Sequence, residues 1–239
     1  MLSQINNDHV KNLQRYQKVL FQRNSLLKNI KDGKSNEKEI EFWDNRLSEE
    51  AANIFFERNK IIKTIRKSSN EFAKNFNEKI DLNIKYLPKM GRNIENKFLE
   101  DEPSIDEIKL IFYESLKKNH LRDIDQRITT IGPHRDDFDI VFNDAPASIT
   151  ASRGQSRIIS LSLKLSEAKE IRNITKRKPV LILDDIFSEL DEKMREKVVT
   201  EILDFDQILL STADISLIDK KNIKDGKYFS INEGIIKAD

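Results

Sequence analysis

Two adjacent carboxylates, Asp184 and Asp185, follow an apolar run at residues 179–183. A short and fully apolar run predicts a strand buried in an α/β sheet, and ligands bind at the carboxyl edge of such sheets. One of these carboxylates suits Mg²⁺, which binds few protein oxygens and keeps several waters. The other is placed to orient or deprotonate an attacking water. An ordinary strand that ends in an acidic turn is the structural alternative.

A hydroxyl and a glycine, Ser152 and Gly154, stand just before a helix predicted at residues 155–172. The start of a helix offers free backbone N–H groups and the positive end of the helix dipole, and a glycine there allows a ligand to approach closely. These are the features that a phosphate site requires. An ordinary serine N-cap explains the same residues. For this segment alone the cap is the simpler interpretation.

The elements that would position these residues alternate between strand and helix after residue 129. The predicted strands are at residues 138–142, 179–184 and 207–212, the predicted helices at 155–172 and 191–203, and a terminal hairpin at 228–237. Because strands joined by helices run parallel and these strands are apolar, we expect a mostly parallel sheet that is buried on both faces.

The first 80 residues contain one glycine and no proline, and their apolar residues recur at steps of three, four and seven. This spacing predicts two long helices folded into an antiparallel pair, with a turn at residues 31–36. Charged residues on the pair, among them a basic run at 58–67, are most simply a solvated outer face. A short strand at 82–87 and a helix at 104–118, which begins with a Ser-x-x-Glu capping box, are expected to follow.

A P-loop requires the pattern G-x-x-x-x-G-K-[ST] between a strand and a helix. The tripeptide Gly33-Lys34-Ser35 lies in the predicted turn of the helical pair, and the position of the required first glycine holds Lys28. No strand precedes the tripeptide, so we interpret it as a hairpin turn. No other Gly-Lys-Ser or Gly-Lys-Thr occurs in the chain, and the 239 residues therefore carry no P-loop.

Composition excludes several classes of function. The chain has 42 Lys and Arg against 41 Asp and Glu, a formal net charge of +1, so nucleic-acid binding would require a local patch. The absence of cysteine excludes disulfide scaffolds, thiolate zinc sites, cysteine nucleophiles and iron–sulfur clusters. Because no apolar run is long enough for a membrane span and no secretory signal is visible, we expect a soluble, cytoplasmic chain with no membrane partner.

The two chemical motifs, taken with their neighbours, resemble the layout of ABC- and SMC-type ATPases. In chain order the resemblance rests on Ser-Arg-Gly-Gln at 152–155, the strand ending in Asp184-Asp185, Ser-Glu-Leu-Asp at 188–191 and the strand ending in Ser211-Thr212. The form of these motifs, with GPHRDDFDI at 132–140 and LQRYQKVLFQRNSLLK at 13–28, resembles the RecF family in particular. The resemblance covers essentially the whole chain, but only the C-terminal two-thirds of a complete family member.

The resemblance implies an α/β fold with two domains. Residues 1–128 would form a helical arm domain, with the antiparallel hairpin at about 8–80, and residues 129–239 would form the C-terminal part of an ABC-type ATPase head with a P-loop NTPase-like sheet. The first strand, the P-loop and the adenine-contacting loop of the family have no match in this sequence. We therefore expect uncovered apolar sheet edge and face, and marginal stability for the chain alone.

The resemblance also implies roles for individual residues. In ATPases of this type the signature motif contacts the γ-phosphate of ATP that the partner protomer holds. The matching residues here are Ser152, Arg153, Gly154 and Gln155. Asp184 matches the Walker B carboxylate, which supports Mg²⁺ through its water shell, and Asp185 stands at the position of the catalytic carboxylate.

Two further motifs carry implied roles. Ser188 and Asp191, with Glu189 and Leu190 between them, match the D-loop, which crosses the dimer interface. Thr212 lies where other ABC proteins carry a switch histidine; because a threonine cannot act as a base, it would only sense phosphate by hydrogen bonding.

The GPHRDD segment superficially resembles a metal cluster, since His134 stands close to Asp136 and Asp137. We interpret it instead as a turn with a network between Arg135 and carboxylates, beside the nucleotide or DNA face.

A complete member of the family would be an ATP-dependent clamp on duplex DNA, with a preference for single-strand junctions, that acts in recombinational gap repair and the SOS response. Its implied cofactors are ATP and Mg²⁺. Its implied partners are DNA, a RecR-like mediator protein and a second copy of itself in an ATP-dependent homodimer. The family is a weak DNA-dependent ATPase, but without a P-loop we expect the present chain neither to bind ATP tightly nor to hydrolyse it alone.

Two other functions stay open. If the ATPase motifs are relics, the chain would be a non-enzymatic module that binds a partner protein or DNA without ATP turnover. Another SMC-like ATPase is the third candidate; the GPHRDD and SRGQ motifs and an arm far shorter than an SMC coiled coil argue against it. The sequence also leaves open whether the chain is a natural truncation, one half of a split protein or a fragment.

Overall fold

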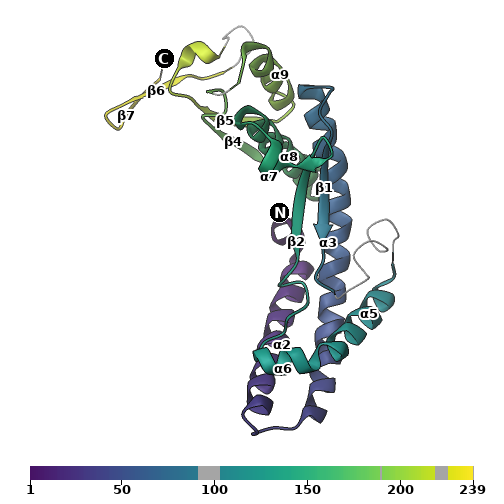
Figure 1. The fold of residues 1–239 in the computed structure, drawn as a ribbon. Coiled ribbons are helices and arrows are strands. Elements are labelled where there is room, and N and C mark those ends of the chain that lie inside the picture. The colour runs from purple at the N-terminus through teal and green to yellow at the C-terminus, as the bar shows by residue number, and fades with distance from the viewer. Residues whose placement is uncertain (91–102, 189, 219–225, 239) are drawn as a thin grey trace. The chain divides into compact units, whose positions relative to one another are not determined.

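The computed structural model describes residues 1–90, 103–188, 190–218 and 226–238 (Figure 1). The chain divides into two units, the first made of Met1–Asn70 with Asp81–Thr150 and the second of Glu71–Ile80 with Ala151–Asp239. This division differs from the expected boundary after residue 128. The physical reason is that residues 137–142 pair with the strand at residues 82–87 and so stay with the first unit.

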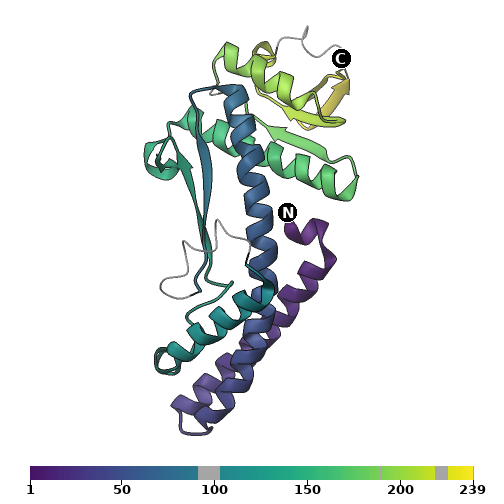
Figure 2. The same ribbon diagram turned by 90° about the vertical axis from the view of Figure 1, so that its right-hand side faces the viewer.

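Two long helices dominate the first unit. They are α2 (Asn7–Lys31) and α3 (Ile40–Phe76), and Figures 1 and 2 show them side by side. The helices are antiparallel, because hydrogen bonds join Asn6 to Glu57 near one end of α2 and Arg23 to Asp44 near the other. The predicted helical pair is therefore confirmed. The short helix α1 (Leu2–Ile5) precedes the pair, and the 3₁₀ turn η1 (Glu37–Glu39) leads into α3.

The turn between the helices contains Gly33, whose φ of +69° favours glycine. The Gly33-Lys34-Ser35 tripeptide is thus a hairpin turn, as predicted. On either side of it, apolar side chains join the two helices: Leu27 packs against Ile40, and Tyr16 packs with Leu47 and Phe55. Each such buried side chain contributes about 1.5–3 kcal/mol, so packing rather than helix propensity stabilises the pair.

An antiparallel sheet accompanies the helices of the first unit. Strand β1 (Leu82–Leu87) pairs with β2 (Asp137–Phe142), which in turn pairs with the short β3 (Ala145–Pro146). Alternate residues of β1 are buried, and the ring of Tyr86 lies 5.7 Å from that of Phe55, between centroids. The strand expected at residues 138–142 is confirmed, but it does not join a parallel sheet, because its partner is the antiparallel β1.

The described part of the first unit also contains the shorter helices α5 (Ile105–Lys118), α6 (His120–Gln126) and α7 (Ala147–Thr150). The predicted capping box opens α5. The Ser104 hydroxyl accepts a hydrogen bond from the Glu107 N–H at 3.2 Å, and the Glu107 carboxylate accepts one from the Ser104 N–H at 2.8 Å. Local sequence alone therefore determines where this helix begins.

The second unit contains the strand–helix alternation expected from the sequence. Its elements are α8 (Arg153–Thr175), β4 (Val180–Asp184), α9 (Glu192–Ile202), β5 (Gln207–Ser211), the 3₁₀ turn η2 (Ile215–Leu217) and the hairpin of β6 (Phe229–Asn232) and β7 (Ile235–Ala238). Strands β4 and β5 are parallel, with Asp184 opposite Ser211 at their carboxyl ends. None of the helices in the described ranges is long and apolar enough to cross a bilayer.

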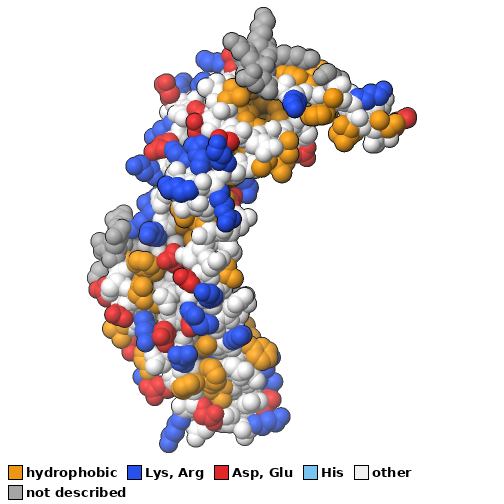
Figure 3. Space-filling model, turned by 180° about the vertical axis from the view of Figure 1, so that it is seen from behind, with side chains coloured by type: hydrophobic (Ala, Val, Ile, Leu, Met, Phe, Trp, Pro, Cys, Tyr) orange, Lys and Arg blue, Asp and Glu red, His pale blue; other side chains and the backbone are white. Residues whose placement is uncertain are grey.

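The parallel sheet is covered on one face only. Leu181 and Leu183 are buried, whereas Val180, Ile182 and Leu209 are 47%, 71% and 53% exposed. Successive side chains of a strand point to opposite faces, so the helices of the unit bury one face and leave the other open. Among the described residues, the expectation of a sheet buried on both faces is therefore wrong, whereas the expectation of an uncovered apolar sheet face is confirmed. Figure 3 shows hydrophobic side chains gathered over β4 and β5 and over the β6–β7 hairpin.

Candidate functional site

The carboxyl ends of β4 and β5 bring Asp184 beside Ser211. The Ser211 hydroxyl donates a hydrogen bond to Oδ1 of Asp184, and the Asp184 side chain is exposed at this edge of the sheet. Its second carboxylate oxygen has no partner among the residues that the structure describes. An exposed carboxylate oxygen of this kind suits Mg²⁺, which keeps most of its waters and binds one or two protein oxygens.

Asp185 adopts a left-handed backbone conformation, with φ of +45°. For a residue with a Cβ this costs on the order of 1 kcal/mol, and such strain is common at functional sites. Three contacts hold the turn. The Asp185 N–H donates to the Ser211 carbonyl at 3.2 Å, and the Asp185 carbonyl accepts from the Ser188 hydroxyl at 3.3 Å and from Nη1 of Arg157. Within the described ranges nothing pairs with the Asp185 carboxylate, which leaves it available to act on water.

Arg157 is a candidate functional residue that the sequence motifs did not reveal. It lies on α8, two residues after the predicted signature motif, and its contact with the Asp185 carbonyl joins that helix to the acidic turn. Arg157 also lines a cavity of about 420 Å³ that reaches Asp184 and Asp185. An arginine on an amphipathic helix is usually a solvent-facing residue, so no local signal could have identified this contact.

The predicted signature motif forms the first turn of α8. The Ser152 hydroxyl accepts a hydrogen bond from the Gln155 N–H at 3.3 Å, and Oε1 of Gln155 accepts one from the Ser152 N–H at 2.8 Å. The N-cap that we considered as the structural alternative is therefore present. The same geometry leaves the N–H groups of Arg153 and Gly154 without a partner in the helix, and an anion placed there would meet them and the helix dipole.

The predicted D-loop and switch residues have local structural contacts. Ser188 bonds the Asp185 carbonyl, and Asp191 is the N-cap of α9, where its carboxylate accepts from the Met194 N–H at 2.8 Å. Glu189 lies outside the described residues. The Thr212 hydroxyl donates to the Asp214 carbonyl at 3.1 Å and thereby belongs to a tight turn after β5.

The GPHRDD segment belongs to the first unit and is organised around Asp136. This carboxylate accepts hydrogen bonds from Nη1 of Arg58 at 3.1 Å, from the Lys89 N–H at 2.8 Å and from the Tyr86 hydroxyl. Burial, and then the charge of Asp136, raise the pKa of Tyr86, which therefore stays a donor. The predicted carboxylate network exists, but its arginine is Arg58 rather than Arg135. In the described part of the chain, no group of three or more His, Asp or Glu could hold a metal ion.

Gly132 allows this segment to approach α2. Its φ is +124°, and a Cβ in its place would lie 2.6 Å from the Tyr16 hydroxyl and 2.9 Å from the Phe112 ring. The Tyr16 hydroxyl is itself 2.6 Å from Nδ1 of His134, whose Nε2 lies 3.1 Å from the Thr129 carbonyl. The close approach explains why glycine is required at position 132.

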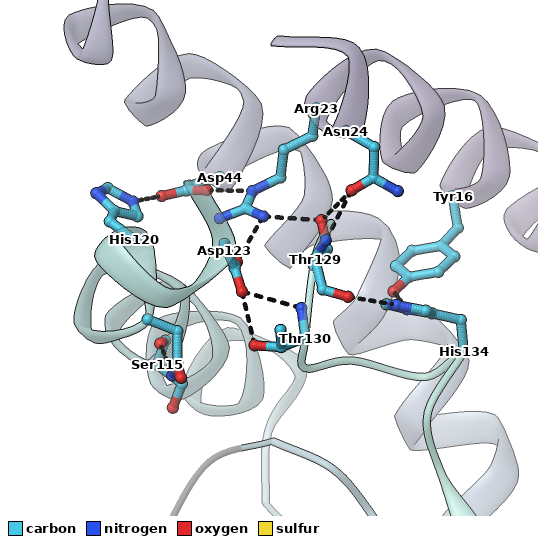
Figure 4. A network of polar contacts seen from close by, with 11 residues as sticks. Tyr16, Arg23, Asn24, Asp44, Ser115, His120, Asp123, Thr129, Thr130 and His134 are labelled. Carbon is cyan, nitrogen blue, oxygen red and sulfur yellow. Dashed lines mark hydrogen bonds and ion pairs between the residues drawn. The ribbon is translucent and has the colours of Figure 1, made fainter. Parts of the chain in front are cut away.

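A buried polar network, which the sequence did not predict, lies beside this segment (Figure 4). Arg23 of α2 is fully buried and donates from Nε to Asp44 of α3 at 2.7 Å, and from Nη1 to Asp123 of α6 at 2.7 Å and to the Thr129 hydroxyl at 2.8 Å. The second oxygen of Asp44 contacts His120. Arg23 thus joins α2 to α3, to α6 and to the loop that precedes β2.

Comparison with known proteins supports the sequence interpretation. No model of a known protein family matches the chain. Proteins named DNA replication and repair protein RecF are similar to it: those of Thermoanaerobacter sp. (strain X514), Clostridium perfringens (strain SM101 / Type A) and Clostridium botulinum (strain 657 / Type Ba4) are 33%, 35% and 36% identical over 98%, 99% and 99% of this chain. The chain spans only 61–62% of the length of these relatives.

Solved structures agree with the sequence relatives. The structure of the recombination mediator protein RecF with ATP in the RecFOR pathway is 30% identical to this chain, covers 99% of it and superposes with a TM-score of 0.81. The structure of RecF with ATPrS covers 98% of the chain with a TM-score of 0.78. This chain corresponds to 60% and 59% of those two proteins. By sequence and by fold, the chain matches the RecF family of DNA replication and repair proteins over nearly its whole length, as a partial chain.

Proposed function

We propose that the chain acts as a RecF-like DNA replication and repair protein, as part of an ATP-dependent clamp on DNA that serves recombinational gap repair. The observation that carries this proposal is the turn after β4. There Asp185, a strained residue whose carboxylate has no partner among the described residues, adjoins the exposed carboxylate of Asp184 at the edge of a parallel sheet. The relatives named RecF, which match along nearly the whole chain, support the choice of family.

The acidic turn would supply the part of the site that promotes hydrolysis. Asp184 would hold Mg²⁺ through its water shell, with the hydroxyl of Ser211 fixing the orientation of the carboxylate. Asp185 would orient and deprotonate the attacking water, and Arg157 and Ser188 would keep its backbone in the left-handed conformation. Magnesium, when bound, would neutralise charge that develops on the phosphate oxygens.

The start of α8 would act on nucleotide held by a second protomer. The open N–H groups of Arg153 and Gly154, with the positive helix end, are suited to a terminal phosphate, and Ser152 and Gln155 shape that turn. Ser188 and Asp191 would lie near the dimer interface, and Thr212 would sense phosphate by hydrogen bonding. Because the 239 residues contain no P-loop sequence, the cradle for the β- and γ-phosphates has to come from polypeptide outside them.

The proposed partners are duplex DNA with adjoining single-strand junctions, a RecR-like mediator protein and a second copy of the completed protein. The neighbouring structures, described as recombination mediators of the RecFOR pathway, support this choice. We also propose that residues 1–128 serve as the arm and residues 129–239 as the ATPase lobe, although residues 129–150 group with the first unit.

The test is complementation with the part of the C. perfringens relative that this chain does not match, supplied by fusion. Asp185→Asn should leave Mg-ATP binding and dimerisation intact and slow hydrolysis by about 10²–10⁴-fold, the usual effect of removing a general base. Ser152→Arg should spare ATP binding to one protomer and block ATP-induced dimerisation, since the long side chain fills the space that the phosphate must approach.

A mixture of these two variants makes the test decisive. A heterodimer would place both lesions in one composite site and leave the other site intact. The mixture should therefore recover activity that neither variant shows alone. If heterodimers form and activity stays at the level of the single variants, the assignment of Ser152 to the partner's nucleotide is wrong.

A non-enzymatic module is the second candidate, and one observation favours it. The hydroxyls of Ser152, Ser188 and Thr212 and the carboxylate of Asp191 all make local cap or turn contacts, which are sufficient to explain these residues without a nucleotide. In that case the fused protein would bind its partners normally but would show no ATP turnover and no difference between wild type and Asp185→Asn.

A further inference from the structure

A run of basic residues without acidic ones lies on α3, in the part of the helix that belongs to the first unit. Residues 58–70 contain five basic residues and no acidic one, although the whole chain has a net charge of only +1. One of the five, Arg58, is engaged with Asp136 and with the Pro133 carbonyl. The other four lie on the outer side of the helix.

Helical geometry gathers these cations on one face. At 3.6 residues per turn, Lys60, Lys63, Arg66 and Lys67 lie within about 120° of one another around the helix axis. Lys60, Arg66 and Lys67 are exposed, whereas Ser68 and Ser69 on the other side are buried. We refer to Lys60, Arg66 and Lys67 as the basic strip. Lys63 is half-buried within it and is not needed for the argument.

The strip differs from the other basic groups of the first unit because three unpaired cations lie within eight residues on one helix face, with no acidic residue among them. No carboxylate among the described residues pairs with Lys60, Arg66 or Lys67. Elsewhere in the unit, several basic side chains have an acidic partner, whereas scattered ones such as Lys18, Lys28 and Arg122 have none among the described residues. The pairs are Lys11–Asp8, Arg15–Glu50, Lys31–Asp125, Arg46–Glu49 and Arg127–Asp32. Unpaired like charges repel one another, so a face that keeps them together is suited to an external anion.

The surroundings of the strip favour a polyanion over a protein partner. Protein interfaces are depleted of lysine and depend on exposed aromatic or aliphatic anchors. Along α3 itself, no exposed large hydrophobic side chain follows Phe42. The strip therefore offers charge and no anchor, which is the composition of a surface that contacts a nucleic-acid backbone.

We propose that the basic strip binds the phosphate backbone of duplex DNA, in a sequence-tolerant manner and without nucleotide. The choice of DNA as the polyanion rests on the proposed function. From Lys60 to Lys67 the helix rises about 10.5 Å, and a duplex carries one negative charge per ~1.7 Å of axis. A duplex segment of that length therefore carries about six phosphates on its two strands, twice the number of side chains in the strip.

The experiment measures binding of the full chain to a fluorescently labelled 30-base-pair duplex of arbitrary sequence by anisotropy, between 50 and 200 mM salt. The strip variant is Lys60→Gln/Arg66→Gln/Lys67→Gln. The matched control is Lys18→Gln/Lys28→Gln/Arg122→Gln. Like the strip variant, it removes two lysines and one arginine, here from exposed positions on α2 and α6. Glutamine has nearly the helix propensity of Lys and Arg, so both variants keep their helices.

Each phosphate contact contributes about 0.9 to the slope of log K against log salt. The strip variant should lower the magnitude of that slope by up to about 2.7, and at 0.1 M salt should bind at least tenfold and at most about 500-fold more weakly. The control should change affinity by less than about threefold. A Lys60→Arg/Lys67→Arg variant changes two of the same positions but keeps their charge, and it should bind like wild type. This result would show that the weaker binding of the glutamine variant comes from lost charge and not from substitution at these positions.

Three outcomes would overturn the proposal: wild-type protein that does not bind the duplex at 50 mM salt, equal losses in the strip and control variants, or tighter binding of polyglutamate than of the duplex. The last would indicate an acidic protein segment as the partner. Because no nucleotide is used, this experiment can fail while the complemented ATPase succeeds, and then only the surface assignment is wrong. Conversely, salt-dependent binding by the strip would persist if the ATPase assignments were wrong.

Discussion

Substitution of Arg23 by methionine provides the sharpest test of how the first unit is held together. Methionine replaces the apolar stem of arginine and removes its charge, so Asp44 and Asp123, both fully buried, lose their shared cation. Breaking a buried ion pair by removing one partner costs about 3–5 kcal/mol, because a charge is left buried without compensation. The Thr129 hydroxyl also loses a hydrogen bond, which adds about 1 kcal/mol.

The expected loss is therefore about 4–6 kcal/mol, a large fraction of the 5–15 kcal/mol that is typical of a folded domain. The assay is urea unfolding followed by circular dichroism. The matched control is Arg46→Met on α3, whose partner is Glu49. Both side chains are about half exposed, at 51% and 49%, and an exposed pair of this kind contributes about 0–1 kcal/mol.

A triple variant, Arg23→Met/Asp44→Asn/Asp123→Asn, separates the charge effect from packing. Asparagine keeps an acceptor for His120 and Thr130 while removing both uncompensated charges. The triple variant should therefore be more stable than Arg23→Met alone. If Arg23→Met costs no more than Arg46→Met, or if the triple variant is the least stable of the set, the ion network does not stabilise the unit in the way argued.

Two further predictions concern the same unit. Gly132→Ala should destabilise the protein by about 1–3 kcal/mol, because the new Cβ would clash with the Tyr16 hydroxyl and alanine would have to keep the positive φ of residue 132. A melting temperature within about 1 °C of wild type would falsify this. Burial, and then the charge of Arg58, lower the pKa of His9. The unfolded chain therefore binds the proton first, and stability present above about pH 6.5 should be lost as the pH falls below it. His9→Gln should reduce the slope of the unfolding free energy against pH between pH 7.5 and 5.5, leaving the share of His134, whose pKa burial also lowers. A slope equal to that of wild type would count against a titrating His9.

The sequence by itself determined the elements that depend on neighbours a few residues away. The bounds of α2 and α3 follow from apolar spacing and a polar turn, and α5 begins where the capping box of Ser104 predicts. The acidic turn after β4 and the first turn of α8 were also identifiable, since the strand, the two aspartates and the Ser-x-x-Gln cap are contiguous. In each case the interactions that stabilise the element join residues that the chain already holds close together.

Only the tertiary structure decided which distant groups meet. Alternation at residues 138–142 predicts a strand but does not reveal that its partner is the antiparallel β1. Nothing local distinguishes Arg23, fully buried with two carboxylates, from the exposed arginines of other helices, and nothing local aims Arg157 at the Asp185 carbonyl. A long side chain costs little to extend in any direction within a helix, so its partner depends on which elements pack beside it. That packing is decided by the burial of apolar faces, which carry no information about the polar groups they bring together.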